Sequence, residues 1–148
     1  MFARQFSHID LLGTSVKGPY HIQENLPNQD AWMIQCTNWG LVGVVCDGFG
    51  SALKADFGAK QACRAVIEAF SIWMHNTEAP LEILIRLIHD LWGLYIAPHD
   101  KKDCATTCLF VGYIKQRVII GQLGDGIVLL KKINDDSIIL IDNRHYRE

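Results

Sequence analysis

Residues 41–50 read LVGVVCDGFG, and this stretch decides how the rest of the chain is interpreted. Its first six residues form an apolar run rich in valine, and a short run of this kind closed by a glycine-rich turn indicates a buried strand. The run ends at Asp47, where a carboxylate is costly unless a positive charge lies close to it. Gly48 and Gly50 allow a sharp turn that brings carbonyl oxygens near a ligand. These oxygens suit a hard divalent cation such as Mg²⁺, and the alternative is an ordinary Asp-Gly turn.

The composition is that of a globular chain. The 148 residues are enough for one domain with a core, and 49% of them are hydrophobic and 20% charged. A formal net charge of -2 gives no electrostatic basis for binding nucleic acid or an anionic membrane. Five cysteines lie mostly within apolar runs, which predicts reduced core thiols and a cytoplasmic location. No apolar run has membrane-spanning length, and the first ten residues lack the apolar core of a signal peptide.

The first part of the chain predicts strands. We expect a strand at residues 9–17 that is bent at Gly13, and a polar loop at residues 21–30. Strands at residues 31–37 and 41–46 should form a hairpin through the tight turn at residues 38–40. A hairpin brings the start of one strand beside the end of the next, so we expect Asp30 and Asp47 to lie close together.

Two helices should follow, and then more strands. Apolar residues, many of them alanine, recur at helical spacing over residues 51–76. A second helix over residues 80–96 is apolar around most of its circumference, and we expect it to be well buried, with Leu84, Leu87, Ile88 and Leu91 in the core. Further strands are expected at residues 104–114, 117–123, 127–133 and 137–141. This order predicts an α+β fold, in which an αα-hairpin covers one face of antiparallel β-sheets.

Acidic turns recur at the predicted strand ends. They are Asn-Gln-Asp at residues 28–30, Asp-Gly at residues 47–48 and Gly-Asp-Gly at residues 124–126. Because the strand ends of one sheet can gather at one edge, the three carboxylates could converge on metal ions. Spacing alone leaves this open.

In this order, the turns resemble motifs of the metal-dependent protein phosphatases of type 2C, the PPM family. That family carries Asn-Glu-Asp before a strand, Asp-Gly-x-Gly before a long helix, Thr-Thr in a later strand and Gly-Asp-Ser at the end of the next. The matching stretches here are residues 28–30, 47–50, 106–107 and 124–126. The loop at residues 18–32 is similar to that of a bacterial branch in which Gln-Asp replaces Glu-Asp. The resemblance covers residues from about 9 to 133.

The resemblance implies a reaction and a set of site residues. The reaction is hydrolysis of phosphoserine or phosphothreonine in a phosphorylated protein substrate, by water that Mg²⁺ or Mn²⁺ activates, usually with two ions. Asp47 and Gly48 match the residues that bind these ions. Gln29 matches an acid that holds a metal-bound water, and Asp30 matches one that positions water. Asp125 matches an aspartate that joins a third metal in some members.

Several family residues are replaced or lie outside the sequence. Gln29 is neutral, Asn25 stands where many members have a phosphate-binding arginine, and Phe49 stands where some have a proposed general-acid histidine. His21, or a basic residue from elsewhere in the chain, is a candidate substitute for the arginine and the histidine. The sequence resembles the first half to two-thirds of the family's α-β-β-α sandwich, so we expect residues 1–148 to be one C-terminally truncated domain. We also expect weak metal binding, little turnover, and an unpaired sheet edge that a homodimer could cover.

Three functions therefore stay open. The first is a Mg²⁺- or Mn²⁺-dependent serine/threonine phosphoprotein phosphatase, which the motif set favours. The second is a non-catalytic phosphatase-like domain that binds a phosphoprotein or regulates a partner, which Gln29, Asn25 and the missing C-terminal aspartates favour. The third is an unrelated α+β binding domain in which the acidic turns are accidental.

Overall fold

A four-stranded antiparallel sheet is the centre of the computed structural model, which describes residues 12–76, 78–131 and 138–142. Its strands lie in the order β1-β2-β3-β4 and comprise Asp30–Cys36, Gly40–Asp47, Cys108–Ile114 and Arg117–Leu123. A second, two-stranded antiparallel sheet consists of β5 (Ile127–Lys131) and β6 (Ile138–Asp142). The predicted α+β class with antiparallel sheets is confirmed.

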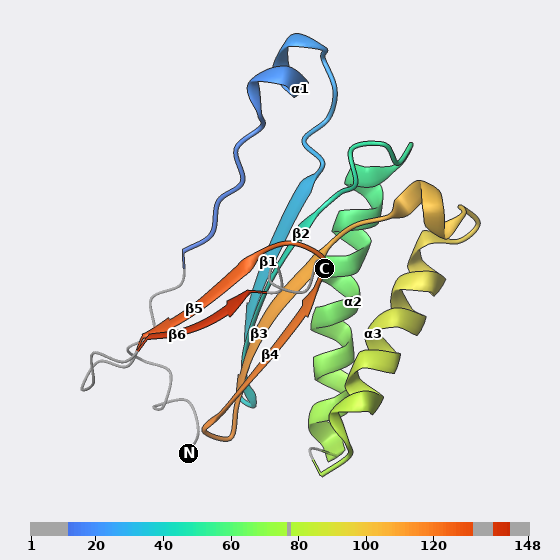
Figure 1. The fold of residues 1–148 in the computed structure, drawn as a ribbon. Coiled ribbons are helices and arrows are strands. Elements are labelled where there is room, and N and C mark those ends of the chain that lie inside the picture. Colours follow the sequence, from blue (N-terminus) through green and yellow to red (C-terminus); the bar gives the residue numbers. More distant parts are fainter. Residues whose placement is uncertain (1–11, 77, 132–137, 143–148) are drawn as a thin grey trace, which may run out of the picture.

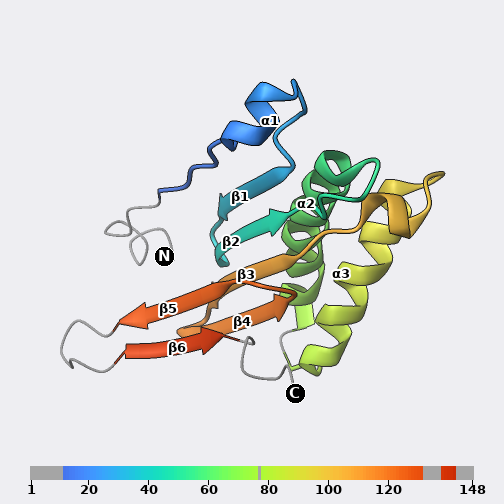
Figure 2. The same cartoon turned by 45° about the horizontal axis from the view of Figure 1, so that its top comes forward.

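Two long helices cover one face of the four-stranded sheet. α2 (Ala55–Trp73) continues into a 3-10 turn, η1 (Met74–Asn76), and α3 (Leu81–Ile96) runs back beside it (Figures 1 and 2). A second 3-10 turn, η2 (Lys101–Cys104), leads from α3 towards β3. The predicted αα-hairpin on one sheet face is therefore confirmed. No helix in the described ranges is long and apolar enough to cross a membrane.

Small side chains bring α2 close to the sheet. Four of its alanines, at positions 59, 62, 65 and 69, are at most 5% exposed. Phe70 reaches the sheet at Gly112, where an added Cβ would lie 2.5 Å from the Phe70 ring. From the sheet, Val42, Val44 and other alternate residues of β2 point into the same core. This period-two alternation is what a strand with one covered face requires.

The β1–β2 hairpin has the predicted register. Asp30 pairs with Asp47 at one end and Cys36 with Leu41 at the other. The backbone N–H of Thr37 closes the turn by donating to the Gly40 carbonyl oxygen at 2.9 Å. The hairpin therefore places the first residue of β1 and the last residue of β2 at the same edge of the sheet.

Some sequence expectations are wrong near element ends. Residues 12–18 form no strand, and residues 9–11 lie outside the described part of the chain. Gly13 instead packs on Trp32, whose ring lies 2.5 Å from the position of an added Cβ. The predicted loop begins inside a short helix, α1 (Pro19–Gln23), because Pro19 at its first position favours a helical start. β3 begins at Cys108 rather than at residue 104, because Cys104 ends η2 and Thr106 makes only an isolated bridge to Gly48.

The expected burial of α3 is only partly correct. Leu84 is 1% exposed, and Leu87, Ile88 and Leu91 are partly buried against the core. Ile85 and Leu94, however, are 51% and 68% exposed. The reason is that α3 packs mainly against α2, while Ile85 borders a cavity between α3 and the sheet. An apolar circumference therefore does not decide how much of a helix is covered.

Candidate functional site

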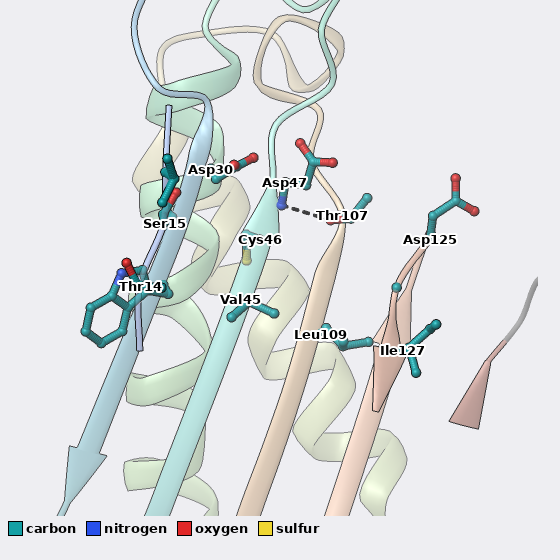
Figure 3. A pocket seen from close by; sticks show the side chains of 14 residues that line it. Thr14, Ser15, Asp30, Val45, Cys46, Asp47, Thr107, Leu109, Asp125 and Ile127 are labelled. Atoms are coloured by element: carbon teal, nitrogen blue, oxygen red, sulfur yellow. Dashed lines mark hydrogen bonds between the residues drawn. The ribbon is translucent and has the colours of Figure 1, made fainter. Parts of the chain in front are cut away.

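Asp30 and Asp47 lie next to each other at the end of the β1–β2 hairpin (Figure 3). They are cross-strand partners, Asp30 as the first residue of β1 and Asp47 as the last residue of β2. Both residues are exposed at the sheet edge. The two carboxylates that the motifs predicted to converge are therefore brought together by local hairpin geometry.

Two threonines fix the backbone of Asp47. The Thr107 hydroxyl accepts a hydrogen bond from the Asp47 N–H at 2.9 Å, and the Thr107 N–H donates to the Asp47 carbonyl oxygen at 2.8 Å. The Thr106 hydroxyl donates to the same carbonyl oxygen at 3.0 Å. In the sequence these threonines only matched a family motif, and no catalytic role was assigned to them. Their position opposite the strand end means that β3 determines where the Asp47 carboxylate is held.

Gly48 lies where the backbone comes too close to α2 for any side chain. A Cβ at Gly48 would stand 2.7 Å from the Ala55 carbonyl oxygen. The Gly48 N–H donates to the Gln29 carbonyl oxygen at 3.1 Å. The side-chain oxygen of Gln29 lies 4.0 Å from the Cβ position of Gly50, beside the same turn. Gln29 therefore supports the Asp-Gly turn through its backbone.

Asn28 orients the start of β1. Its Oδ1 accepts a hydrogen bond from the Asp30 N–H at 3.2 Å, and its Nδ2 donates to the Ser15 hydroxyl at 2.7 Å. A side chain that caps the backbone two residues on is a typical turn device of asparagine. Sequence reasoning missed this role, although the asparagine stood in the motif. The bond to Ser15 joins the N-terminal segment to the acidic edge.

The two aspartates open onto a cavity of about 480 Å³. Asp125 lines the same cavity from the turn between β4 and β5, and Figure 3 places it on the far side of Thr107 from Asp30. That turn is made by Gly124 and Gly126, whose φ angles of 81° and 150° suit glycine. Of the predicted site residues, Asp30, Asp47 and Asp125 thus share one cavity, whereas Gly48 and Gln29 lie beside it.

The electrostatics of this edge are those of crowded negative charge. Partial burial of the Asp47 carboxyl raises its pKa above the usual value, and its hydrogen bond with Asp30 and the negative charges of Asp30 and Asp125 raise it further. A positive charge on His21 acts in the opposite direction. A carboxyl whose pKa is raised by other acids is one that a cation would stabilise in its charged form.

The donor atoms suit one hard cation with water completing its shell. Mg²⁺ is usually held by one or two carboxylates and keeps several waters, and Asp30, Asp47 and the backbone of Gly48 offer oxygens only. Among the described residues, no three His, Cys, Asp or Glu side chains come together so that they could hold a metal ion. The arrangement therefore supplies two facing carboxylates rather than a complete cage.

A comparison with known families decides what kind of domain this is. The sequence model described as "Protein phosphatase 2C" matches residues 17–147. The chain belongs to the protein phosphatase 2C family. The matched range includes Asp30, Asp47, the two threonines and Asp125. The resemblance drawn from the sequence motifs is confirmed.

A solved protein phosphatase 2C structure has a similar fold. It contains the PP2C phosphatase domain and a fragment of the regulatory domain of the cell fate determinant SpoIIE from Bacillus subtilis. The TM-score is 0.52 at 14% sequence identity, and the match covers 78% of this chain but 32% of that chain. At this identity the likeness concerns the fold alone. In sequence, no curated protein matches the chain.

Proposed function

We propose that the acidic edge is part of the catalytic site of a Mg²⁺- or Mn²⁺-dependent phosphatase that acts on phosphoserine or phosphothreonine in proteins. The facing pair of Asp30 and Asp47 in a protein phosphatase 2C chain carries this proposal. The raised pKa of Asp47 supports it, because a cation would relieve the repulsion between the carboxylates. In this proposal residues 1–148 contribute to a single domain.

Each residue of the edge has a proposed task. Asp47 and Asp30, together with the Gly48 carbonyl, would hold the cation, which when bound supplies a nucleophilic water and neutralises phosphate charge. Asp30 also orients water by accepting its hydrogen bond, and Asp125 offers a further carboxylate across the cavity. Gln29, whose side chain is a neutral amide, keeps the turn in place through its backbone carbonyl oxygen.

Phosphate needs a positive partner as well. His21 is the described basic residue whose charge already acts on Asp47. We assign it the binding of a phosphate oxygen, in place of the arginine that many family members carry.

A second function is favoured by the small number of ligands. Two facing carboxylates and a neutral Gln29 suit weak binding of one cation better than tight binding of a pair, because two close cations repel strongly. A phosphatase-like domain that binds a phosphoprotein without turnover fits this donor set. Under either function, we expect the 148-residue chain by itself to turn over phosphoester slowly.

The test measures metal binding and turnover separately. Mn²⁺ binding is followed by calorimetry and turnover with an aryl phosphate and a phosphothreonine peptide, in the wild type, Asp47→Asn and the control Asp90→Asn, which removes an exposed acid on α3. Mn²⁺ binding lost only in Asp47→Asn supports the metal site, and turnover lost in parallel supports the enzyme. Binding without turnover supports the second function. Equal Mn²⁺ binding by all three proteins would refute the site.

A further inference from the structure

Three thiols lie directly behind the acidic edge. Cys46 of β2, Cys63 of α2 and Cys108 of β3 belong to one buried cluster and are 3%, 1% and 8% exposed. The side chain of Cys46 is within hydrogen-bonding reach of both other thiols. Buried cysteines commonly serve as small apolar residues. Here the strand register also places two of them, Cys46 and Cys108, opposite each other.

Cys46 and Cys108 stand opposite each other on neighbouring strands. Val45 pairs with Leu109, and the same register continues to the bridge between Gly48 and Thr106. Between these two points, Cys46 faces Cys108 and Asp47 faces Thr107. Because the backbone hydrogen bond at this end joins Thr107 to Asp47, the adjacent cysteines occupy a non-hydrogen-bonded position.

That position suits a disulfide. Opposed residues at non-hydrogen-bonded positions have Cα atoms about 4.5 Å apart. Disulfides accept Cα separations of about 4.4–6.8 Å, so the pair needs no large backbone movement. Both side chains also point to the same core face, as their low exposure shows. We propose that Cys46 and Cys108 are a peroxide-sensitive dithiol that closes into a disulfide between β2 and β3.

An oxidant has a route to one of the two sulfurs. Cys108 lines a cavity of about 500 Å³ whose other walls include Trp92 and Ile88 of α3 and Leu123 of β4. It is also the more exposed member of the pair. Hydrogen peroxide is small enough to enter such a space, and this makes Cys108 the thiol that reacts first.

The reaction balances with one peroxide per disulfide. The Cys108 sulfur, after losing its proton, attacks a peroxide oxygen; an S–O bond forms, the O–O bond breaks, and the leaving hydroxide takes up a proton to become water. The Cys46 sulfur then attacks the oxidised sulfur. The S–S bond forms, the S–O bond breaks, and a second water leaves with the Cys46 proton. The two thiols lose two electrons in total, and the peroxide gains them.

The disulfide would act on the acidic edge, a consequence that rests on the proposed metal site. Opposed Cβ atoms lie about 4.5–5.5 Å apart in a sheet, whereas a disulfide holds them at about 3.8 Å. Closing the bond therefore pulls β2 and β3 together beside the Asp47–Thr107 contact. Disturbing the residues that support metal ligands typically costs 10–100-fold in affinity, so we expect Mn²⁺ binding to weaken by about tenfold on oxidation.

Peptide mapping can identify the bond without ambiguity. Trypsin should release residues 18–54, 61–64 and 103–115, and replacing Cys36 and Cys104 by alanine leaves one cysteine in each of these peptides. This Cys36→Ala/Cys104→Ala protein is treated with graded hydrogen peroxide and mapped without reduction. We expect a peptide 18–54 linked to 103–115 that dithiothreitol separates. A link from 18–54 to 61–64, or sulfinic acid without any link, would overturn the proposal.

Two further measurements complete the test. Adding Cys46→Ala to the same background should abolish the link, and if this variant fails to fold, the mapping of the parent protein still decides the question. Mn²⁺ binding is then compared between the oxidised and reduced parent. About tenfold weaker binding after oxidation supports control of the edge, and equal binding refutes it. A disulfide in a protein that binds no Mn²⁺ in either form would confirm the thiol pair while refuting the proposed metal site.

Discussion

Gly58 and Gly93 are both glycines inside helices, and we predict that replacing each with alanine has opposite effects. Gly58 lies in α2, where an added Cβ would stand 2.0 Å from the Cys104 carbonyl oxygen and 2.6 Å from its carbonyl carbon. Gly93 lies in α3, where the nearest atom would be the Lys101 Cε at 3.6 Å. The first neighbour is backbone, whereas the second is the end of a flexible side chain.

The expected free energies follow from these contacts. Either substitution gains about 1 kcal/mol of helix propensity. Gly58→Ala also forces the Cys104 backbone outwards. Two hydrogen bonds resist this movement: the Lys54 N–H donates to the Asp103 carbonyl oxygen at 2.7 Å, and the Phe49 N–H donates to the Ala105 carbonyl oxygen at 2.9 Å. Overpacking of this kind costs about 3 kcal/mol at its upper end. Gly58→Ala should therefore lose about 2 kcal/mol of unfolding free energy, and Gly93→Ala should gain about 1 kcal/mol.

Thermal unfolding followed by circular dichroism measures the difference. For a domain of this size, 1 kcal/mol shifts Tm by about 2–4 °C, so Gly58→Ala should melt about 4–8 °C lower and Gly93→Ala about 2–4 °C higher. Urea unfolding at 25 °C provides an independent value. Equal stabilisation of both variants would refute the close approach of α2 to the segment that leads into β3.

Three further predictions concern the Asp47 carboxyl, the hydrogen bond by which Thr107 holds the Asp47 backbone, and the core. The pKa of Asp47 is raised in the folded state, so the folded protein binds more protons at this residue than the unfolded chain does. The stability of the fold should therefore fall as the pH rises from about 3.8 through the raised value. In urea titrations without metal, Asp47→Asn should be about 0.5 kcal/mol more stable than wild type at pH 7 but not at pH 3. Thr107→Val removes the 2.9 Å hydrogen bond from the Asp47 N–H and should lower the unfolding free energy by about 1 kcal/mol in the same assay. An unchanged urea midpoint would show that this hydrogen bond does not stabilise the fold. Phe70→Ala empties a fully buried site against Phe110 and should cost about 3–5 kcal/mol, and a loss below 1 kcal/mol would contradict the core packing.

Local pattern was sufficient for the hairpin and its acidic end. Alternating apolar residues, a tight turn and the requirement for one covered face fix the register of β1 and β2, and the proximity of Asp30 and Asp47 follows. The bounds of β4, residues 117–123, were predicted for the same reason. These features depend on neighbours that are close in sequence.

Features that depend on distant neighbours could not be predicted in this way. The apolar circumference of α3 suggested full burial, but periodicity does not reveal which sides of a helix will meet a neighbour, and Leu94 remains exposed. The Asn28–Ser15 hydrogen bond could be predicted only if the path of the N-terminal segment were known. The opposed positions of Cys46 and Cys108 could be predicted only from the pairing of β2 with β3. Both long helices separate these two strands in the chain.

The same division runs through the candidate site. The Asp30–Asp47 pair is local, but the backbone of Asp47 is held by Thr107, which is 60 residues away in sequence. Thr107 in turn follows the segment that packs against Gly58 of α2. The position of the Asp47 carboxylate therefore depends on how the helices pack on the sheet. Three changes should therefore act on the site through the backbone of Asp47 at the end of β2. They are a disturbance at Gly58, loss of the Thr107 hydroxyl, and closure of the Cys46–Cys108 bond.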